Sequence, residues 1–334
     1  MQKILIIQTA FIGDVVLATG LIEKLHQHYP HAQIDFLVRK GNEELLLNHP
    51  FLNELLIWEK KENKLYNLWK VLRKIRRKRY DAVINVQRFA ATGLLTAFSK
   101  AKHTVGFDKN PLSFLFSQKI KHSVSRGEAS IHEIERNHLL IASITDSIPA
   151  KPALYPSEKD RESVQSFKKI PYIVIAPASV WFTKQYPVDK WVSFINQVPF
   201  SIPIYLVGAP DNKVLCDEIR KRTSNPFVQN LCGKNSFLQS ASLQKDAIMN
   251  YVNDSAPLHF ASAVNAPVTA IYCSTLPSFG FGPLSDTRFI VELKEPLACR
   301  PCGIHGQKSC PEGHFFCAKK IQDEQLLKTL IQIR

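Results

Sequence analysis

Residues 3–17 read KILIIQTAFIGDVVL, and this stretch decides the fold class. The apolar run Ile4–Ile7 is typical of a strand that is buried on both faces of a parallel sheet. A loop follows over Gln8–Gly13, and we expect a helix from Asp14 toward His28. This order of strand, loop and helix predicts an α/β protein with a parallel sheet. The loop is neither G-x-G-x-x-G nor a Walker loop, which disfavours a dinucleotide dehydrogenase or an ATPase.

The alternation of strand and helix continues through the first half of the chain. Further strands are expected at Ile34–Val38, Glu54–Trp58 and Asp81–Val86, with helices near Leu45–Leu47 and over Lys64–Arg79. The three prolines that follow cannot continue a helix and predict a linker: Pro149, Pro152 and Pro156.

The second half repeats the rhythm. Strands are expected at Tyr172–Ala176, Ile202–Val207, Ala247–Val252 and Val268–Tyr272, and helices at Val188–Gln197, Asn212–Arg222 and Pro257–Val264. The pattern predicts two Rossmann-like domains, 1–155 and 156–319, that face each other across a cleft. Ligands bind such sheets at the carboxyl ends of the strands.

Composition and charge narrow the class of protein. The 334 residues are 45% hydrophobic and 22% charged, which is ordinary for a globular protein and disfavours disorder. The net charge of +14 favours an acidic partner, such as nucleic acid, an anionic membrane or a phosphorylated substrate. No apolar run reaches the ~18 residues of a membrane span. Seven cysteines, an odd number, without a signal-peptide pattern predict a reducing cytoplasm.

Three loops carry residues suited to chemistry. Asp14 is either a helix N-cap or a general base at the end of the first strand. Lys184, in the loop 176–187, is either solvated or bound to a diphosphate as a point charge. In the segment 253–259, Asp254 or Ser255 caps a helix whose N-terminus offers N–H groups to an anion, and Asp254 alternatively binds a sugar hydroxyl. His259 is either a core or a helix-surface histidine.

Together these loops resemble those of the bacterial ADP-heptose:lipopolysaccharide heptosyltransferases, glycosyltransferase family 9, whose members have the two-domain GT-B fold. The matching pieces cover nearly the whole chain: 3–17, Tyr80–Gln87 (YDAVINVQ), Ala176–Trp191 with its Lys-x-x-Pro, Asn253–Ala263 (NDSAPLHFASA) and the cysteine-bearing tail Cys299–Cys317. The sequence departs from the family at Ala256, where the family usually has Gly.

The resemblance implies an inverting transfer of a sugar from an ADP-sugar to a phosphorylated, lipid-linked core oligosaccharide. Asp14 would deprotonate the acceptor hydroxyl, and Lys184 would stabilise the leaving diphosphate without a bound metal. The donor would contact Thr183, Gly208, Asp211, Asp254, Ser255, Ala256 and His259. The acceptor would contact Gly13, Arg88 and Arg136. The C-terminal helix, about 320–334, would pack back on the first domain.

Two of these residues have structural alternatives. Asp211 is equally suited to cap the helix that starts near Asn212. Arg136 is equally suited to a surface helix with i, i+3 ion pairs.

The segment Lys60–Arg79 holds ten basic residues and one acidic residue, a net charge of +9. It is either a solvated helix face or a contact with the anionic inner leaflet of the membrane. Nucleic acid is disfavoured because no recognition fold accompanies the charge. A contact with the inner leaflet would make the protein peripheral at the cytoplasmic face of the inner membrane.

The tail contains Cys299, Cys302, Cys310 and Cys317, with His305 and His314 between them. Four thiolates can hold a structural zinc, and the alternatives are reduced thiols or a labile disulfide. Such a zinc would sit apart from the catalytic loops.

Two other functions remain open on the same fold. One is a nucleotide-sugar epimerase or hydrolase, and the other is a non-catalytic protein that binds anionic glycolipid.

Overall fold

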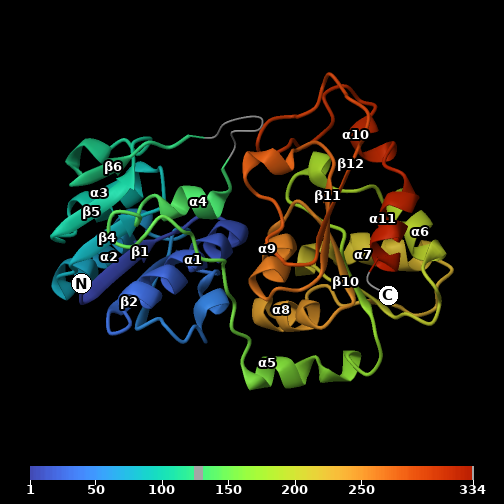
Figure 1. Ribbon diagram of the computed structural model, residues 1–334, viewed down its shortest axis with the longest axis horizontal. Coiled ribbons are helices and arrows are strands. Elements are labelled where there is room, and N and C mark those ends of the chain that lie inside the picture. Colours follow the sequence, from blue (N-terminus) through green and yellow to red (C-terminus); the bar gives the residue numbers. More distant parts are fainter. Residues whose placement is uncertain (124–130, 333–334) are drawn as a thin grey trace. The chain divides into compact units, whose positions relative to one another are not determined.

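A computed structural model describes residues 1–123 and 131–332 (Figure 1). These residues form two compact units. The first unit comprises 1–123 and 131–155, and the second begins at Pro156. No helix in the described part of the chain is both long and apolar enough to cross a bilayer.

The first unit is built on a six-stranded parallel sheet in the order β3-β2-β1-β4-β5-β6. Its strands are β1 (Lys3–Ile7), β2 (Gln33–Arg39), β3 (Glu54–Trp58), β4 (Ala82–Asn85), β5 (His103–Phe107) and β6 (Gln118–Ile120). Its helices are α1 (Ile12–His28), α2 (Lys64–Lys78), α3 (Ala90–Ala97) and α4 (Glu133–His138).

The second unit has a six-stranded parallel sheet in the order β12-β11-β10-β7-β8-β9. Its strands are β7 (Ile173–Ala176), β8 (Ile204–Leu206), β9 (Val228–Asn230), β10 (Met249–Asn253), β11 (Val268–Tyr272) and β12 (Arg288–Glu292). Its helices are α5 (Glu158–Ser163), α6 (Val188–Gln197), α7 (Lys213–Arg222), α8 (Phe237–Lys245), α9 (Ala256–Ala263), α10 (Phe316–Lys319) and α11 (Asp323–Ile331).

Both sheets have the strand order of a Rossmann fold, 3-2-1-4-5-6, when the strands of each unit are counted in chain order. In such a sheet the order reverses between the first and fourth strands, and ligands bind beside the carboxyl ends of those two strands. The relevant pairs are β1 with β4 and β7 with β10. The loops that follow these four strands are therefore the places to look for a site.

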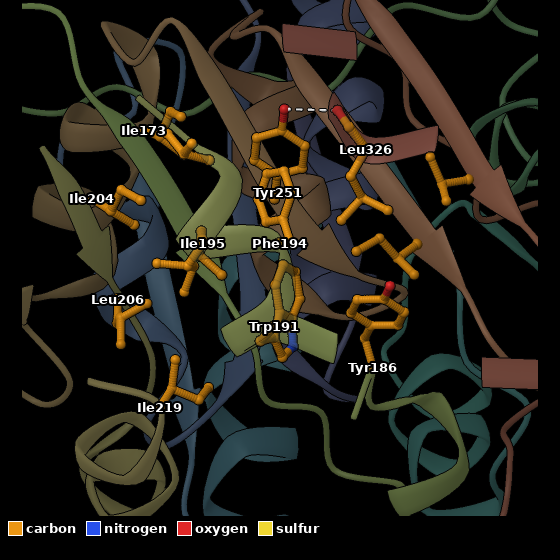
Figure 2. Packing of buried hydrophobic residues seen from close by; sticks show 14 of the residues in the cluster. Ile173, Tyr186, Trp191, Phe194, Ile195, Ile204, Leu206, Ile219, Tyr251 and Leu326 are labelled. Carbon is orange, nitrogen blue, oxygen red and sulfur yellow. Dashed lines mark hydrogen bonds between the residues drawn. The ribbon is translucent and has the colours of Figure 1, made fainter. Parts of the chain in front are cut away.

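Successive side chains of β7 point to opposite faces of the sheet and belong to two different hydrophobic clusters. Ile173 and Ile175 face a cluster formed with α6, α7 and α11, whereas Val174 and Ala176 face the opposite side, toward α8 and α9. Figure 2 shows the first of these clusters, in which the Tyr251 hydroxyl donates a hydrogen bond to the carbonyl oxygen of Leu326 at 3.1 Å. Side chains buried on both faces explain why the strand reads as an uninterrupted apolar run.

The amphipathic helix expected at Lys64–Arg79 is confirmed as α2. Its buried residues recur at helical spacing and pack with Trp58 of β3: Leu68, Val71, Leu72 and Ile75. The helix ends at Arg79, which has a left-handed backbone conformation with φ of +50°.

The C-terminal helix differs from the expectation that it packs back on the first domain. α11 packs against α6 and β12 of the second unit. The Thr269 hydroxyl of β11 donates to the Thr329 hydroxyl at 2.8 Å, and Lys190 of α6 pairs with Asp323 at 2.8 Å. Leu326 and Leu330 are buried in the second unit's own core, so this contact belongs to that unit. Residues 333–334, included in the expected helix, lie outside the described residues.

Candidate functional site

In the second unit, Lys184 and Asp254 form a close ion pair at its topological switch point. Lys184 follows β7 and Asp254 follows β10, and the Lys184 ammonium lies 2.6 Å from the Asp254 carboxylate. Both side chains are largely buried, with 14% and 8% of their surfaces exposed. The Thr275 hydroxyl donates a second hydrogen bond to the same carboxylate oxygen at 2.7 Å. Asp254 is therefore an orienting partner of Lys184, where the sequence suggested a helix cap or a sugar contact.

A buried asparagine joins the two loops that carry this pair. The side chain of Asn253 donates to the Pro177 carbonyl at 2.7 Å and accepts from the Tyr186 N–H at 3.0 Å. It therefore holds both ends of the Lys184 loop against the end of β10. A single side chain that satisfies backbone groups of another loop fixes that loop in place.

Helix α9 begins immediately after Asp254. Ser255 is its N-cap in extended conformation, and its hydroxyl donates to the Asn253 carbonyl at 3.3 Å and caps no backbone N–H of the helix. Ala256 and Pro257, the first two helical residues, are half-buried. The first N–H groups of a helix have no intrahelical partner and attract anions. His259 is buried on this helix, so of its two interpretations the core position is observed.

Of three further residues expected near the donor, Thr183 and Gly208 have structural roles, whereas Asp211 does not cap the helix. The fully buried Thr183 accepts hydrogen bonds at its hydroxyl oxygen from the Ser274 hydroxyl and the Gln307 N–H, at 2.9 and 2.8 Å. Gly208 follows β8, and a Cβ there would lie about 3 Å from the Asn212 and Cys232 side chains. Asp211 is exposed; the side chain that accepts from the loop backbone, at Ala209 N–H, is that of Asn212.

In the first unit, Asp14 lies in the first turn of α1, beside the loop that follows β1. The helix begins at Ile12 with Phe11 as its N-cap, so Asp14 is the third helical residue. Its carboxylate accepts a hydrogen bond from the Phe11 N–H at 3.1 Å. The expectation that Asp14 is the N-cap is therefore wrong, and its side chain instead accepts from the backbone of the N-cap residue. Gly13 precedes Asp14 in the same turn.

Helix α4 packs on α1 and brings an ion pair to Asp14. Arg136 is 2% exposed and bonds to the Glu133 carboxylate, to the Ser123 carbonyl at 2.9 Å and to the Ile131 carbonyl at 3.2 Å. The expected i, i+3 pair is therefore present, but it is buried and does not lie on a helix surface. Burial raises the pKa of Glu133 to about 7, and the nearby negative charge of Asp14 adds to this shift while Arg136 opposes it.

His122 is affected by the two arginines that were expected to bind the acceptor, Arg88 and Arg136. Burial lowers the pKa of His122 to about 4, and the positive charges of Arg88 and Arg136 contribute to this shift. Arg88, in the loop after β4, is exposed. Of the three acceptor residues expected from the sequence, Arg88 therefore has a side chain open to a ligand, whereas Arg136 is bonded to the protein.

Lys60 lies at the switch point of the first unit and does not belong to α2. Its ammonium donates to the carbonyl and the hydroxyl of Thr9, both at 2.8 Å, and lies 4.6 Å from the centre of the Trp58 ring. Burial lowers its pKa to about 8, and the neighbouring cations Arg39 and Lys64 add repulsion. This half-buried cation beside the loop after β1 is suited to an anionic ligand.

The four tail cysteines line a single cavity of about 320 Å³, together with His314. Thr183 and Ser274 line the same cavity, so the expectation that the cysteines sit apart from the catalytic loops is wrong. All seven cysteines are free, with none in a disulfide. Over 1–123 and 131–332, no group of three or more His, Cys, Asp or Glu side chains is already arranged to hold a metal ion.

The raised pKa of Glu133 leads to a testable prediction on stability. A carboxyl whose pKa is higher in the folded state stabilises the fold below its unfolded pKa, and this stability is lost as pH rises through the folded value. We expect the free energy of unfolding to fall between about pH 4.5 and 7, by up to about 3 kcal/mol. Glu133→Gln should flatten this part of the profile in thermal unfolding measured from pH 5 to 8. An unchanged slope in the variant would contradict the assignment.

Several residues of the site were not anticipated from the sequence. Asn253, Thr275, Lys60 and Glu133 all contact or influence expected residues from elsewhere in the chain. Asn253 had a usable signal, because it is a polar residue at the end of a buried strand. The other three depend on tertiary contacts that no spacing reveals.

Comparison with known proteins gives a consistent result. Residues 68–310 match the family model described as glycosyltransferase family 9 (heptosyltransferase). The chain is 25% identical over 277 residues to lipopolysaccharide heptosyltransferase 3 of Escherichia coli, which covers 79% of this chain and 82% of that protein.

Two solved structures are similar over nearly the whole chain. A family 9 glycosyltransferase from Veillonella parvula DSM 2008 has a TM-score of 0.84 at 18% identity and covers 99% of this chain and 97% of its own. The ADP-heptose lipopolysaccharide heptosyltransferase II of E. coli has a TM-score of 0.80 at 22% identity, with coverage of 99% and 98%. The expected GT-B fold class, with two Rossmann-like domains, is confirmed.

Proposed function

The chain belongs to glycosyltransferase family 9, and we propose that it transfers a heptose, or a related sugar, from an ADP-sugar to the core oligosaccharide of lipopolysaccharide or lipooligosaccharide. Its relatives support this assignment, since they are lipopolysaccharide and lipooligosaccharide heptosyltransferases. The similar E. coli structure, an ADP-heptose heptosyltransferase, supports ADP as the nucleotide of the donor.

The observation that carries the proposal is the Lys184–Asp254 pair beside the N-terminus of α9. An ammonium has three N–H donors, and a bond to Asp254 occupies only one of them. The remaining donors of Lys184 and the Ala256 N–H at the start of α9 would bind the diphosphate of the donor. Pro257 has no N–H, and the Leu258 N–H donates to the Ser255 carbonyl at 3.0 Å. Cation and helix dipole together neutralise the charge that develops on a leaving diphosphate, so the reaction requires no metal.

We assign the general base to Asp14. The acceptor hydroxyl oxygen attacks the anomeric carbon, the bond from that carbon to the diphosphate oxygen breaks, and the hydroxyl proton passes to the Asp14 carboxylate. Attack opposite the leaving group inverts the anomeric centre. Arg88 and Lys60 would bind the anionic groups of the acceptor, with Gly13 in the adjoining helical turn. Arg136 would act indirectly, through Glu133.

The proposal is tested by the nucleotide that the protein binds. We expect ADP and ADP-heptose to raise the unfolding temperature, because a ligand at 100 times its Kd adds about 2.7 kcal/mol of stability. UDP, GDP and their sugars should have little effect. Stabilisation by UDP or GDP compounds would overturn the heptose assignment. Release of ADP at the same rate with and without acceptor would favour a hydrolase.

The acceptor is lipid-linked, so we place the enzyme at the cytoplasmic face of the inner membrane, where helix α2 would contact the lipid. Its outer face exposes Leu65, Tyr66 and Trp69 by 78%, 67% and 54%. Aromatic side chains beside cations are typical of helices that lie in a membrane interface.

The basic residues of α2 also favour this helix as the membrane contact. Lys74 and Lys78 form ion pairs with Glu54, so their charges are already neutralised within the protein. Among the residues described, no ion pair involves the other exposed cations on this helix: Lys64, Lys70, Arg73 and Arg77. Each basic residue near an anionic surface contributes about 1 kcal/mol of attraction.

Vesicle binding tests this surface. We expect the protein to sediment with phosphatidylglycerol vesicles but not with phosphatidylcholine vesicles, and to be released by high salt. Changing Tyr66 and Trp69 together to Ser should weaken binding about tenfold. A matched control is Val214→Ser on α7, which removes an apolar side chain that is 80% exposed. Equal binding of both variants, or equal binding to neutral vesicles, would rule out α2 as the contact.

We also propose that the four tail cysteines hold a structural zinc. Thiolates are the preferred ligands of soft metal ions, and four of them around one cavity suit a closed site with no position for substrate. Metal analysis of purified protein should find about one zinc per chain. Purified protein that contains no zinc, and in which all four tail thiols can be titrated, would contradict the zinc proposal.

A further inference from the structure

The cysteine-bearing segment 299–317 is hydrogen-bonded to the loop that carries Lys184. The Thr183 N–H donates to the Gln307 carbonyl at 3.1 Å, and the Gln307 N–H donates back to the Thr183 hydroxyl at 2.8 Å. A second connection runs through Ser274, whose carbonyl accepts from the Cys302 N–H at 2.9 Å and whose N–H donates to the Thr183 carbonyl at 3.2 Å. The segment is therefore hydrogen-bonded to Thr183 directly, through Gln307, and indirectly, through Ser274.

Gly306 brings the backbone of this segment onto the side chain of Lys184 itself. A Cβ at this position would lie 2.9 Å from Cγ of Lys184 and 3.0 Å from the Thr183 hydroxyl oxygen. Gly306 also has a φ of +76°, a conformation that other residues rarely adopt. Only a residue without a side chain permits this approach, so the backbone at Gly306 packs directly against the Lys184 stem.

The same segment surrounds the thiol cavity. Its lining includes the four cysteines, and it is completed on the donor side by Thr183, Ser274 and Gln307. Zinc–thiolate bonds are about 2.3 Å long. In the described part of the chain, no three of these side chains already lie close enough together to share a metal ion. Closing four thiolates on a metal ion would therefore draw the segment inward, and the segment is attached to the Lys184 loop.

We propose that segment 299–317 is a positioning strap for Lys184, and that metal binding by its four thiols is coupled through Gly306 and Gln307 to binding of the donor diphosphate. The proposal rests on the proposed function of Lys184. By thermodynamic reciprocity, zinc must tighten ADP binding by the same factor by which ADP tightens zinc binding. Gly306 and Gln307 act through Lys184 and are positioning residues.

Calorimetric titration of the full-length protein with ADP tests the strap. Gly306→Ala should weaken ADP binding about tenfold or more, because the added methyl group pushes the Lys184 stem aside. Gly313→Ala is the matched control, since Gly313 lies in the same segment with a φ of +69° and no atom within 4 Å of its Cβ position. Both variants carry similar backbone strain, so an extra loss of ADP affinity in Gly306→Ala reports the contact with Lys184. Equal ADP affinities in the two variants would overturn the strap.

The coupling is tested with zinc itself as the probe. Zinc-loaded wild-type protein should bind ADP several-fold more tightly than protein stripped with a chelator. Cys299→Ser with Cys302→Ser should bind ADP as weakly as the stripped protein and should no longer respond to zinc. An ADP affinity that is independent of zinc, or a protein that binds no zinc, would overturn the coupling. A wild-type protein that binds no ADP would instead overturn the proposed function.

Discussion

Replacing Asp14 with Asn will lower the turnover number for sugar transfer by about 10²–10⁴-fold, with donor affinity unchanged. The amide keeps an oxygen that can accept the hydrogen bond from the Phe11 N–H, so the start of α1 is preserved. What the variant loses is the ability to accept a proton from the acceptor hydroxyl. Measurement of kcat with saturating donor and acceptor, beside ADP affinity by calorimetry, separates the two effects.

Asp14→Ala is the matched comparison, because it removes both the base and the cap. It should lose as much turnover as Asp14→Asn and in addition about 1 kcal/mol of stability. An Asp14→Asn enzyme that retains a tenth or more of the wild-type kcat would show that another group takes the proton.

Replacing Lys184 with Met will lower kcat/KM for the donor by about 10²–10³-fold. The change removes the cation that we propose binds the diphosphate, so KM for the donor should rise and kcat should fall together. It also leaves the Asp254 carboxylate buried without its partner, which costs about 3 kcal/mol in the free energy of unfolding. Steady-state kinetics and thermal unfolding measure these two consequences independently.

A second substitution separates catalysis from stability. Lys184→Met combined with Asp254→Asn removes the stranded charge, so most of the lost stability should return. Transfer should stay as low as in the single variant. Recovery of transfer in the double variant would mean that Lys184 serves only to neutralise Asp254.

The fold was largely predictable because strands buried on both faces of a parallel sheet appear in the sequence as continuous apolar runs. The run Ile4–Ile7 and the strand near Val268–Tyr272 are apolar on both faces and are observed as β1 and β11. Four strands were not predicted: β5, β6, β9 and β12. β6 and β9 have three residues each, and β6 has no buried residue. In β12 the three hydrophobic residues lie between two charged residues, and one position of the strand is buried.

The site was predictable where it follows strand ends, and unpredictable where it depends on neighbours. Lys184 and Asp254 were both named from the sequence. Their direct contact depends on Asn253, which bonds to Tyr186 and Pro177, 67 and 76 residues earlier in the chain. Arg136 was expected near a ligand or on a surface, whereas packing of α4 on α1 buries it with Glu133. Burial of charge is decided by tertiary packing, which composition does not reveal.

Lys60 illustrates the same limit. It belongs by sequence to the most basic stretch of the chain, and charge counting places it on the surface. The structure removes it from α2 and bonds it to Thr9 at the end of β1. The basic stretch therefore has distinct parts: one cation at the switch point, two that flank α2, and the others on the helix itself.

The ion pair between Lys184 and Asp254 also bears on how the enzyme is reset after each cycle. A buried ammonium that had only the donor as its partner would be stranded when the nucleotide left, and this would slow product release. If Lys184 binds the donor as proposed, its bond to Asp254 would persist when ADP departs, so the ammonium would never be left buried without a counterion. The carboxylate would thereby limit how tightly the product is retained.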